Sequence, residues 1–163
     1  MHMQDSFITI DGWHAHIRFS AAHVIPEYKK CGRLHGHTYA VHAKIYGTPD
    51  QQGIILDFSL LKKKLCKIVD TLDHKIIIPD KNPNIQLTKD QTSITLRSLG
   101  KTYTFPTEDC VLLPIFSSSA ENLSLYILDS LIEDLKDIPS IKSIEIGVDE
   151  GYGQGARIIK NMP

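Results

Sequence analysis

The residues best suited to chemistry gather in one segment, Phe19 to His37, which reads FSAAHVIPEYKKCGRLHGH. His35 and His37 are two residues apart at the predicted start of a strand, so their imidazoles project from the same face. Gly36 between them allows close approach, and His23 follows the preceding predicted strand, where an antiparallel return would bring it beside the other two. Three neutral imidazoles with one open position are typical of a catalytic zinc site.

Other interpretations of these histidines and of the nearby cysteine stay open at this point. Cys31 could serve as a fourth ligand, and a closed Cys-His site of that kind would only hold the loop together. Spacing alone does not separate the two alternatives. We expect the remaining histidines to lie on exposed faces without a set of partners; they are His2, His14, His16 and His42.

Composition narrows the class of protein. The chain has 163 residues, with 42% apolar and 23% charged side chains, which fits a single domain over residues 1–163. The net charge of -1 gives no field that favours nucleic acid or a membrane surface, so a small-molecule partner fits better. Three widely spaced cysteines, Cys31, Cys66 and Cys110, argue against a disulfide framework and predict a cytoplasmic location.

The elements that must position these side chains follow from periodicity. Alternating patterns predict strands at residues 13–19 and 38–46, paired as antiparallel neighbours, and further strands at 141–148 and 156–159. Apolar residues at helical spacing predict helices around residues 61–72, with Asp57 or Ser59 as the cap, and 119–135. Between them, residues 93–96 and 102–105 flank a turn at Gly100 and predict a hairpin. The order predicts an α+β fold with an antiparallel sheet and two helices on one face.

Several motifs resemble the 6-pyruvoyl-tetrahydropterin synthase family, and specifically its 6-carboxy-tetrahydropterin synthase branch. The run CGRLHGH places a cysteine four residues before the first histidine, as in that branch, and FSAAH matches the strand that carries the first metal ligand. Further matches follow in family order across nearly the whole chain: GIILDF at residues 53–58, LDHK at 72–75 and SAENL at 119–123.

The resemblance implies zinc held by His23, His35 and His37, and acid/base chemistry by Cys31, Asp73 and His74. A neighbouring histidine or metal can lower the pKa of a thiol enough to make it a base at neutral pH. A carboxylate such as that of Asp73 can orient and support a protonated histidine. Without the resemblance, the Asp73-His74 pair would be a polar helix C-terminus, where histidine suits the helix dipole.

The resemblance also implies a glutamate that binds the amino-pyrimidine edge of a pterin. Counting back from Ala156-Arg157 places it at Glu150, with Asp149 as a one-residue alternative. The motif SAENL adds Ser119, Ala120 and Glu121 to the expected substrate site. For Glu121 a second interpretation has equal weight, because residues 118–121 read as a capping box for the second helix. The glycine-rich segment 151–155 reads as a turn, since it lacks the lysine and hydroxyl of a phosphate loop.

By resemblance, the fold is a tunnelling fold with a four-stranded antiparallel sheet, assembled as a hexamer of two stacked trimers with active sites between subunits. The implied reaction converts 7,8-dihydroneopterin triphosphate to 6-carboxy-tetrahydropterin, acetaldehyde and triphosphate, for queuosine or archaeosine synthesis. One alternative is a 6-pyruvoyl-tetrahydropterin synthase that keeps the side chain, and another is a non-catalytic zinc protein. Cations near the site are either triphosphate ligands or a solvated run of charge; they are Lys29, Lys30 and Arg33. The hairpin within residues 85–113 is longer than in compact bacterial members of the family; its role stays open at this point, with assembly as one alternative to chemistry.

Overall fold

The computed structural model describes residues 6–163, in which strands and two helices form the predicted α+β fold. The strands of the larger sheet are β1 (Ser6–Ile10), β2 (Arg18–His23), β3 (His35–Gly47), β4 (Lys75–Pro79), β8 (Cys110–Leu113), β9 (Ile141–Glu150) and β10 (Gly155–Asn161). The helices are α1 (Phe58–Val69) and α2 (Ala120–Leu135). Within the described part of the chain, neither helix is long and apolar enough to cross a membrane.

The large sheet contains the predicted antiparallel core and three further strands. Its order is β10-β9-β3-β2-β4-β8, and β10, β9, β3 and β2 are antiparallel neighbours as predicted. β4 and β8 extend the sheet through parallel pairs, while β1 pairs with residues 43–47 of β3, beyond the stretch that β2 occupies. The sheet therefore has seven strands where the sequence predicted four.

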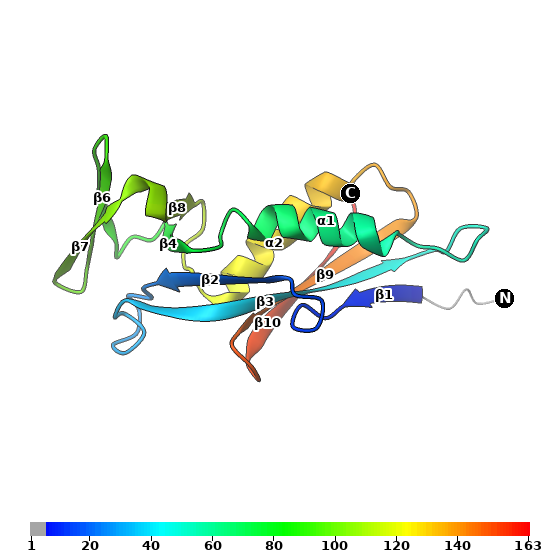
Figure 1. Cartoon of the computed structure of the whole chain (residues 1–163), viewed down its shortest axis with the longest axis horizontal. Coiled ribbons are helices and arrows are strands. Elements are labelled where there is room, and N and C mark those ends of the chain that lie inside the picture. The colour runs from blue at the N-terminus through cyan, green and yellow to red at the C-terminus, as the bar shows by residue number, and fades with distance from the viewer. Residues whose placement is uncertain (1–5) are drawn as a thin grey trace.

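Both helices cover the same face of this sheet, as Figure 1 shows. The predicted apolar stripes are buried, with Leu61 and Leu65 of α1 and Leu123 of α2 each 0% exposed. Asp57 caps α1, because its side chain accepts a hydrogen bond from the Ser59 amide at 2.8 Å. The helices thus seal one face of the sheet and leave the strand ends to build a site.

The predicted strand at residues 13–19 is wrong over most of its length. Residues 12–16 form a turn, in which the Asp11 carboxylate accepts a hydrogen bond from the Trp13 amide at 2.9 Å and the Asp11 carbonyl accepts one from the Ala15 amide at 2.8 Å. His16 adopts a φ of 58°, which no strand tolerates. The side chain of Asp11 therefore competes successfully with sheet pairing, and β2 begins only at Arg18.

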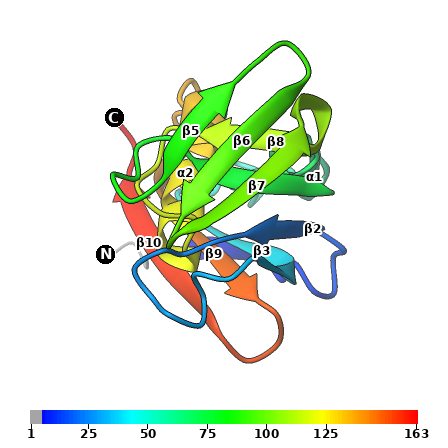
Figure 2. The same ribbon diagram turned by 90° about the vertical axis from the view of Figure 1, so that its left-hand side faces the viewer.

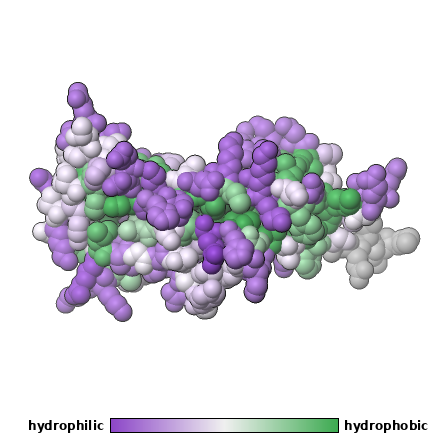
Figure 3. Space-filling view, in the orientation of Figure 1, coloured by the Kyte–Doolittle hydropathy of each residue, from purple (hydrophilic) through white to green (hydrophobic). Residues whose placement is uncertain are grey.

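A second, smaller sheet lies at one end of the molecule, and Figure 2 looks onto it. It consists of β5 (Gln86–Lys89), β6 (Ser93–Ser98) and β7 (Lys101–Pro106), so the predicted hairpin β6–β7 is confirmed and gains a third strand. A short 3-10 turn, Thr107–Asp109, leads from it to β8. The sheet covers its own apolar cluster of Val24, Ile78, Ile85, Ile94 and Leu96. Figure 3 shows apolar surface near both ends of the molecule, broken up by hydrophilic side chains.

Candidate functional site

Three histidines meet where β2 ends and β3 begins. The strands pair so that His23 lies opposite His35, and His37 lies opposite Ala21. Ligand nitrogens of the three rings all lie within 4.8 Å of one another. A side chain at Gly36 would place its Cβ 2.9 Å from the Ala21 carbonyl oxygen, so glycine permits this close pairing. The predicted meeting of the three imidazoles is therefore observed.

Hydrogen bonds fix which nitrogen carries a proton in two of the rings, His23 and His35. His23 Nδ1 lies 2.9 Å from the Ser118 carbonyl oxygen, and His35 Nδ1 lies 2.6 Å from the Arg33 carbonyl oxygen. Since a carbonyl oxygen only accepts, both Nδ1 atoms donate and both Nε2 atoms keep a lone pair.

The lone pairs converge on one point. The Nε2 atoms of His23 and His35 are 3.1 Å apart, and the buried Nε2 of His37 has no hydrogen-bond partner. Acceptor nitrogens this close repel one another unless a cation lies between them. The donor set therefore fits a metal ion such as zinc.

Burial lowers the pKa of two of the rings, His23 and His37. Desolvation, with the nearby charges of His35 and His37 adding to it, lowers the pKa of His23 to about 4. Desolvation and the charge of His35 also lower the pKa of His37 below its usual value. Because metal ligation needs neutral imidazole, these shifts favour the metal-binding form of His23 and His37.

Cys31 lies beside this centre but outside the ligand group. Among residues 6–163, the three histidines alone form a cluster with ligand atoms this close, and Cys31 is not part of it. The cysteine instead lines a cavity of about 480 Å³ together with His35, His37 and Glu150. This placement favours a thiol that faces substrate over a thiol that holds the metal.

Glu150 and Asp149 lie on opposite faces of β9. Glu150 faces the site, with Oε2 3.9 Å from His37 Nε2, and burial raises the pKa of its carboxyl. Asp149 accepts hydrogen bonds from Trp13 Nε1, His42 Nε2 and an Arg157 nitrogen at 2.8–2.9 Å. Asp149 is therefore fully engaged elsewhere, and Glu150 is the carboxylate available to a ligand.

The start of α2 lines the same region. Ser119, Ala120 and Glu121 border a cavity of about 710 Å³ that also includes Cys31 and Glu150. The proposed capping box is wrong, because Ser119 is the N-cap and accepts a hydrogen bond from the Asn122 amide at 3.4 Å.

Ser118, the residue that sequence reasoning assigned to the capping box, serves the histidines instead. Its Oγ lies 3.1 Å from His23 Nδ1, close to its own carbonyl oxygen. The sequence carries no signal for this role, because the contact joins residues 95 positions apart.

Asp73 and His74 form a hydrogen-bonded pair away from Cys31. Asp73 Oδ2 lies 2.8 Å from His74 Nδ1, and Asp73 Oδ1 accepts from the Ser20 amide at 2.8 Å. Burial acts to raise the pKa of Asp73, but these hydrogen bonds and the charge of His74 outweigh it and lower the pKa. His74 is exposed and borders a cavity of about 630 Å³, which includes His37 but neither Cys31 nor Glu150.

Of the remaining histidines, His14 and His16 are exposed as predicted, whereas His42 differs from expectation. His42 is partly buried, accepts at Nδ1 from the Gly12 amide at 3.1 Å and donates from Nε2 to Asp149. The prediction that it lacks partners is therefore wrong. Each of the two exposed histidines has one local contact: His14 lies 2.9 Å from Asp11, and His16 lies 3.0 Å from an Arg18 nitrogen. His2 lies outside the described residues.

Comparisons with known proteins agree with this geometry. The chain matches the family model of 6-pyruvoyl tetrahydropterin synthase over residues 14–159. A Methanocaldococcus jannaschii protein, provisionally named a 6-carboxy-5,6,7,8-tetrahydropterin synthase, is 36% identical over 91% of this chain and 93% of its own length. A Haemophilus influenzae protein with the name 6-carboxy-5,6,7,8-tetrahydropterin synthase is 30% identical over 78% of this chain and 85% of its own.

Solved structures give the same result. The 6-pyruvoyl tetrahydropterin synthases of Plasmodium vivax and Plasmodium falciparum are 30% and 33% identical to this chain, each with a TM-score of 0.88. Each comparison covers 98% of this chain and 99% of the other, which confirms the tunnelling fold. From the family match and these full-length relatives together, this chain belongs to the 6-pyruvoyl tetrahydropterin synthase family of lyase-type enzymes.

Proposed function

We propose that this chain is a zinc-dependent 6-carboxy-5,6,7,8-tetrahydropterin synthase, which converts 7,8-dihydroneopterin triphosphate to 6-carboxy-tetrahydropterin, acetaldehyde and triphosphate. The observation that carries the proposal is a set of three histidines with converging ligand atoms, beside a cavity that Cys31 and Glu150 both line. The names of the relatives at 36% and 30% identity support this product. The product would serve deazaguanine synthesis, for queuosine or archaeosine.

His23, His35 and His37 would hold the metal through their Nε2 atoms. The carbonyl oxygens of Ser118 and Arg33 keep two of the rings in the required tautomer and orientation. Zinc bound there would supply Lewis-acid polarisation of oxygen atoms on the substrate side chain. Because Cys31 lies outside the ligand group, the set leaves a coordination position open.

Glu150 would anchor the pterin, and Glu121, Ser119 and Ala120 would border the ring from the start of α2. A ring edge that donates paired hydrogen bonds stabilises the charged form of a carboxylate, which offsets the burial that raises the pKa of Glu150.

Cations near the same cavities would bind the triphosphate. Lys30 and Arg33 border the 480 Å³ cavity with the histidines, and Lys29 lies in the same loop. An anionic chain on the substrate would thus extend from the ring site toward these side chains.

Cys31 would move protons at the side-chain carbons, and His74, supported by Asp73, would carry another proton. Within one chain these groups border different cavities, so we assign His74 to the active site of a neighbouring copy. A mixing experiment tests this assignment. Cys31→Ala and His74→Ala variants, each inactive alone, should regain part of the activity when refolded together, and no recovery would contradict shared sites.

A hexamer of two stacked trimers would provide such neighbours. Within residues 6–163, the outermost strands in the order of the large sheet are β10 and β8, and their outer edges are free to pair with other copies. Closure into a ring would protect these edges from uncontrolled association. A cytoplasmic location suits three cysteines that are all free in the described structure.

The main alternative is a 6-pyruvoyl-tetrahydropterin synthase, which would eliminate triphosphate and keep the side chain. The Plasmodium relatives with that name favour it, since they match with a TM-score of 0.88. A non-catalytic zinc protein is a second alternative, but it gives no reason for Glu150 and Cys31 to share a cavity with the histidines.

Product analysis separates these possibilities. Zinc-loaded protein is incubated with 7,8-dihydroneopterin triphosphate, and products are identified by mass spectrometry beside an acetaldehyde assay. We expect 6-carboxy-tetrahydropterin with an equal amount of acetaldehyde. Formation of 6-pyruvoyl-tetrahydropterin without acetaldehyde would establish the main alternative, and no turnover would contradict both enzymes.

A further inference from the structure

The loop that carries Cys31 has little regular structure of its own. Residues 24–34 join β2 to β3, and the side chains at 27–30 are all exposed. Internal bonds close the loop on itself, with the Ile25 amide donating to the Cys31 carbonyl at 2.8 Å and the Gly32 amide donating to the Tyr28 carbonyl at 2.7 Å. These bonds fix the fold of the loop, but its position against the cavity needs support from outside.

Three contacts from the small sheet and its connections provide that support. Val24, at the start of the loop, is buried in the cluster that the small sheet covers. Asn82, which is 4% exposed, donates from Nδ2 to Glu27 Oε1 at 2.7 Å. A Cβ atom on Gly32 would overlap Leu99 Cδ1, so the Leu99 side chain lies directly against the backbone beside Cys31.

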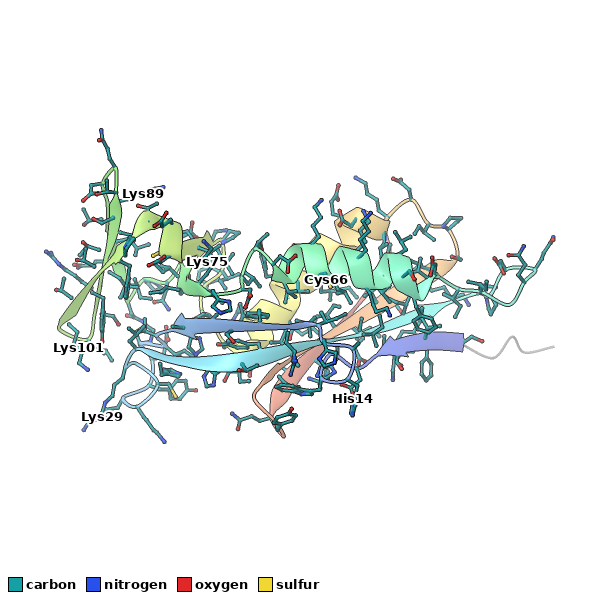
Figure 4. All side chains as sticks on the ribbon, viewed as in Figure 1. His14, Lys29, Cys66, Lys75, Lys89 and Lys101 are labelled. Atoms are coloured by element: carbon teal, nitrogen blue, oxygen red, sulfur yellow. The ribbon has the colours of Figure 1, made fainter. Side chains whose placement is uncertain are left out.

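The views place the hairpin turn near this loop. Figure 2 shows the lower end of the β6–β7 hairpin beside the loop that follows β2. In Figure 4, Lys101 at the hairpin turn and Lys29 in the loop lie at the same end of the molecule. The turn of the hairpin therefore reaches over the loop.

Leu99 is a poor residue for the turn that it occupies. Leu99 and Gly100 have φ values of 50° and 72°, a two-residue hairpin turn in which asparagine and glycine are preferred. Leucine at positive φ is strained, and its side chain is also 54% exposed. The positive φ and the exposed side chain do not stabilise the hairpin, whereas the contact of Leu99 with Gly32 holds the loop in place.

We propose that the small sheet positions the Cys31 loop, with Leu99 and Asn82 as positioning residues for the acid–base group of the reaction. The inference rests on the proposed function for its catalytic consequence. It gives the hairpin, whose role the sequence left open, a role within the subunit.

The test uses a substitution that should favour the turn. Leu99→Asn supplies a preferred turn residue and removes the contact with Gly32. We expect unchanged or higher thermal stability, unchanged zinc content and unchanged oligomeric mass, but a fall in kcat of about 10- to 100-fold with little change in KM. Leu99→Met keeps an apolar side chain of similar length and should restore most of kcat.

Asn82→Asp provides an independent variant. The carboxylate can still accept from the Asn84 amide, as the Asn82 side chain does at 2.8 Å, but it no longer donates to Glu27. Two carboxylates would then face each other, so the loop should be released while the local turn remains. We expect the same pattern of lowered kcat and retained zinc.

A second readout does not depend on catalysis. In a Cys66→Ala, Cys110→Ala background, Cys31 is the one thiol of the chain, and its rate of alkylation by iodoacetamide reports the freedom of the loop. We expect Leu99→Asn and Asn82→Asp to raise this rate by about an order of magnitude. If wild-type protein turns nothing over but alkylation rises in both variants, the proposed function fails and the positioning role stands. Unchanged alkylation and kcat in both variants, or a loss of kcat that follows altered oligomeric mass, would overturn the proposal.

Discussion

Replacing Cys31 with alanine separates a catalytic thiol from a structural ligand. Because Cys31 lies outside the group of converging histidine nitrogens, Cys31→Ala should retain zinc. Loss of a general acid–base group costs about 10²–10⁴-fold in rate, which corresponds to about 3–5 kcal/mol of activation free energy. Since the side chain is only partly buried, the free energy of unfolding should change by less than about 1 kcal/mol.

The assay compares three quantities in the same preparations: turnover of 7,8-dihydroneopterin triphosphate, zinc per chain by mass spectrometry of the metal, and thermal stability. Cys66→Ala is the matched control, because Cys66 is a free, partly buried cysteine in α1 that borders neither Cys31 cavity. We expect the control to keep wild-type turnover. If Cys31→Ala loses zinc and several kcal/mol of stability together with activity, the thiol is a ligand and the catalytic assignment is refuted.

Other predictions follow from the carboxylates and the start of α2. Glu150→Gln should keep zinc but raise KM by about 10-fold or more, since the neutral amide loses charge-assisted hydrogen bonds to the ring; an unchanged KM would exclude Glu150 as the anchor. Burial acts to raise the pKa of Asp149, but hydrogen bonds from Trp13, Arg157 and His42 outweigh it and hold the folded pKa below the unfolded value of about 3.9. Ionised Asp149 therefore stabilises the folded state fully above the unfolded pKa, and this contribution is lost as pH falls through the folded pKa. In urea unfolding, Asp149→Asn should have a free energy of unfolding lower than that of the wild type by about 1–3 kcal/mol at pH 7. This difference should shrink only in the acid range where Asp149 becomes protonated. Ser119→Ala should lower the free energy of unfolding by about 1 kcal/mol through loss of the cap, whereas Glu121→Ala should raise KM without that loss; the reverse pattern would contradict both assignments.

The histidine cluster could be predicted because its geometry is local. Two histidines two residues apart on a strand share a face, and an antiparallel neighbour returns His23 to the same place. Both helices were also predictable, since their apolar stripes and the cap at Asp57 follow from spacing and residue type. Each of these inferences depends on residues close in sequence or on a single pairing.

The remaining features depend on contacts that spacing does not encode. The alternation at residues 13–19 suggested a strand, but hydrogen bonds of Asp11 favour a turn. The parallel strands β4 and β8 and the support of Cys31 by Leu99 arise from tertiary packing. The same holds for Ser118, whose bond to His23 joins the chain just before α2 to the end of β2.

The central claim is a three-histidine metal centre with an open position beside a free Cys31. X-ray absorption at the zinc edge of the purified protein tests it most directly. We predict three imidazole nitrogens at about 2.0–2.1 Å, one further oxygen or nitrogen, and no sulfur. A sulfur shell at about 2.3 Å, absent in Cys31→Ala, would place the thiol on the metal and contradict the account.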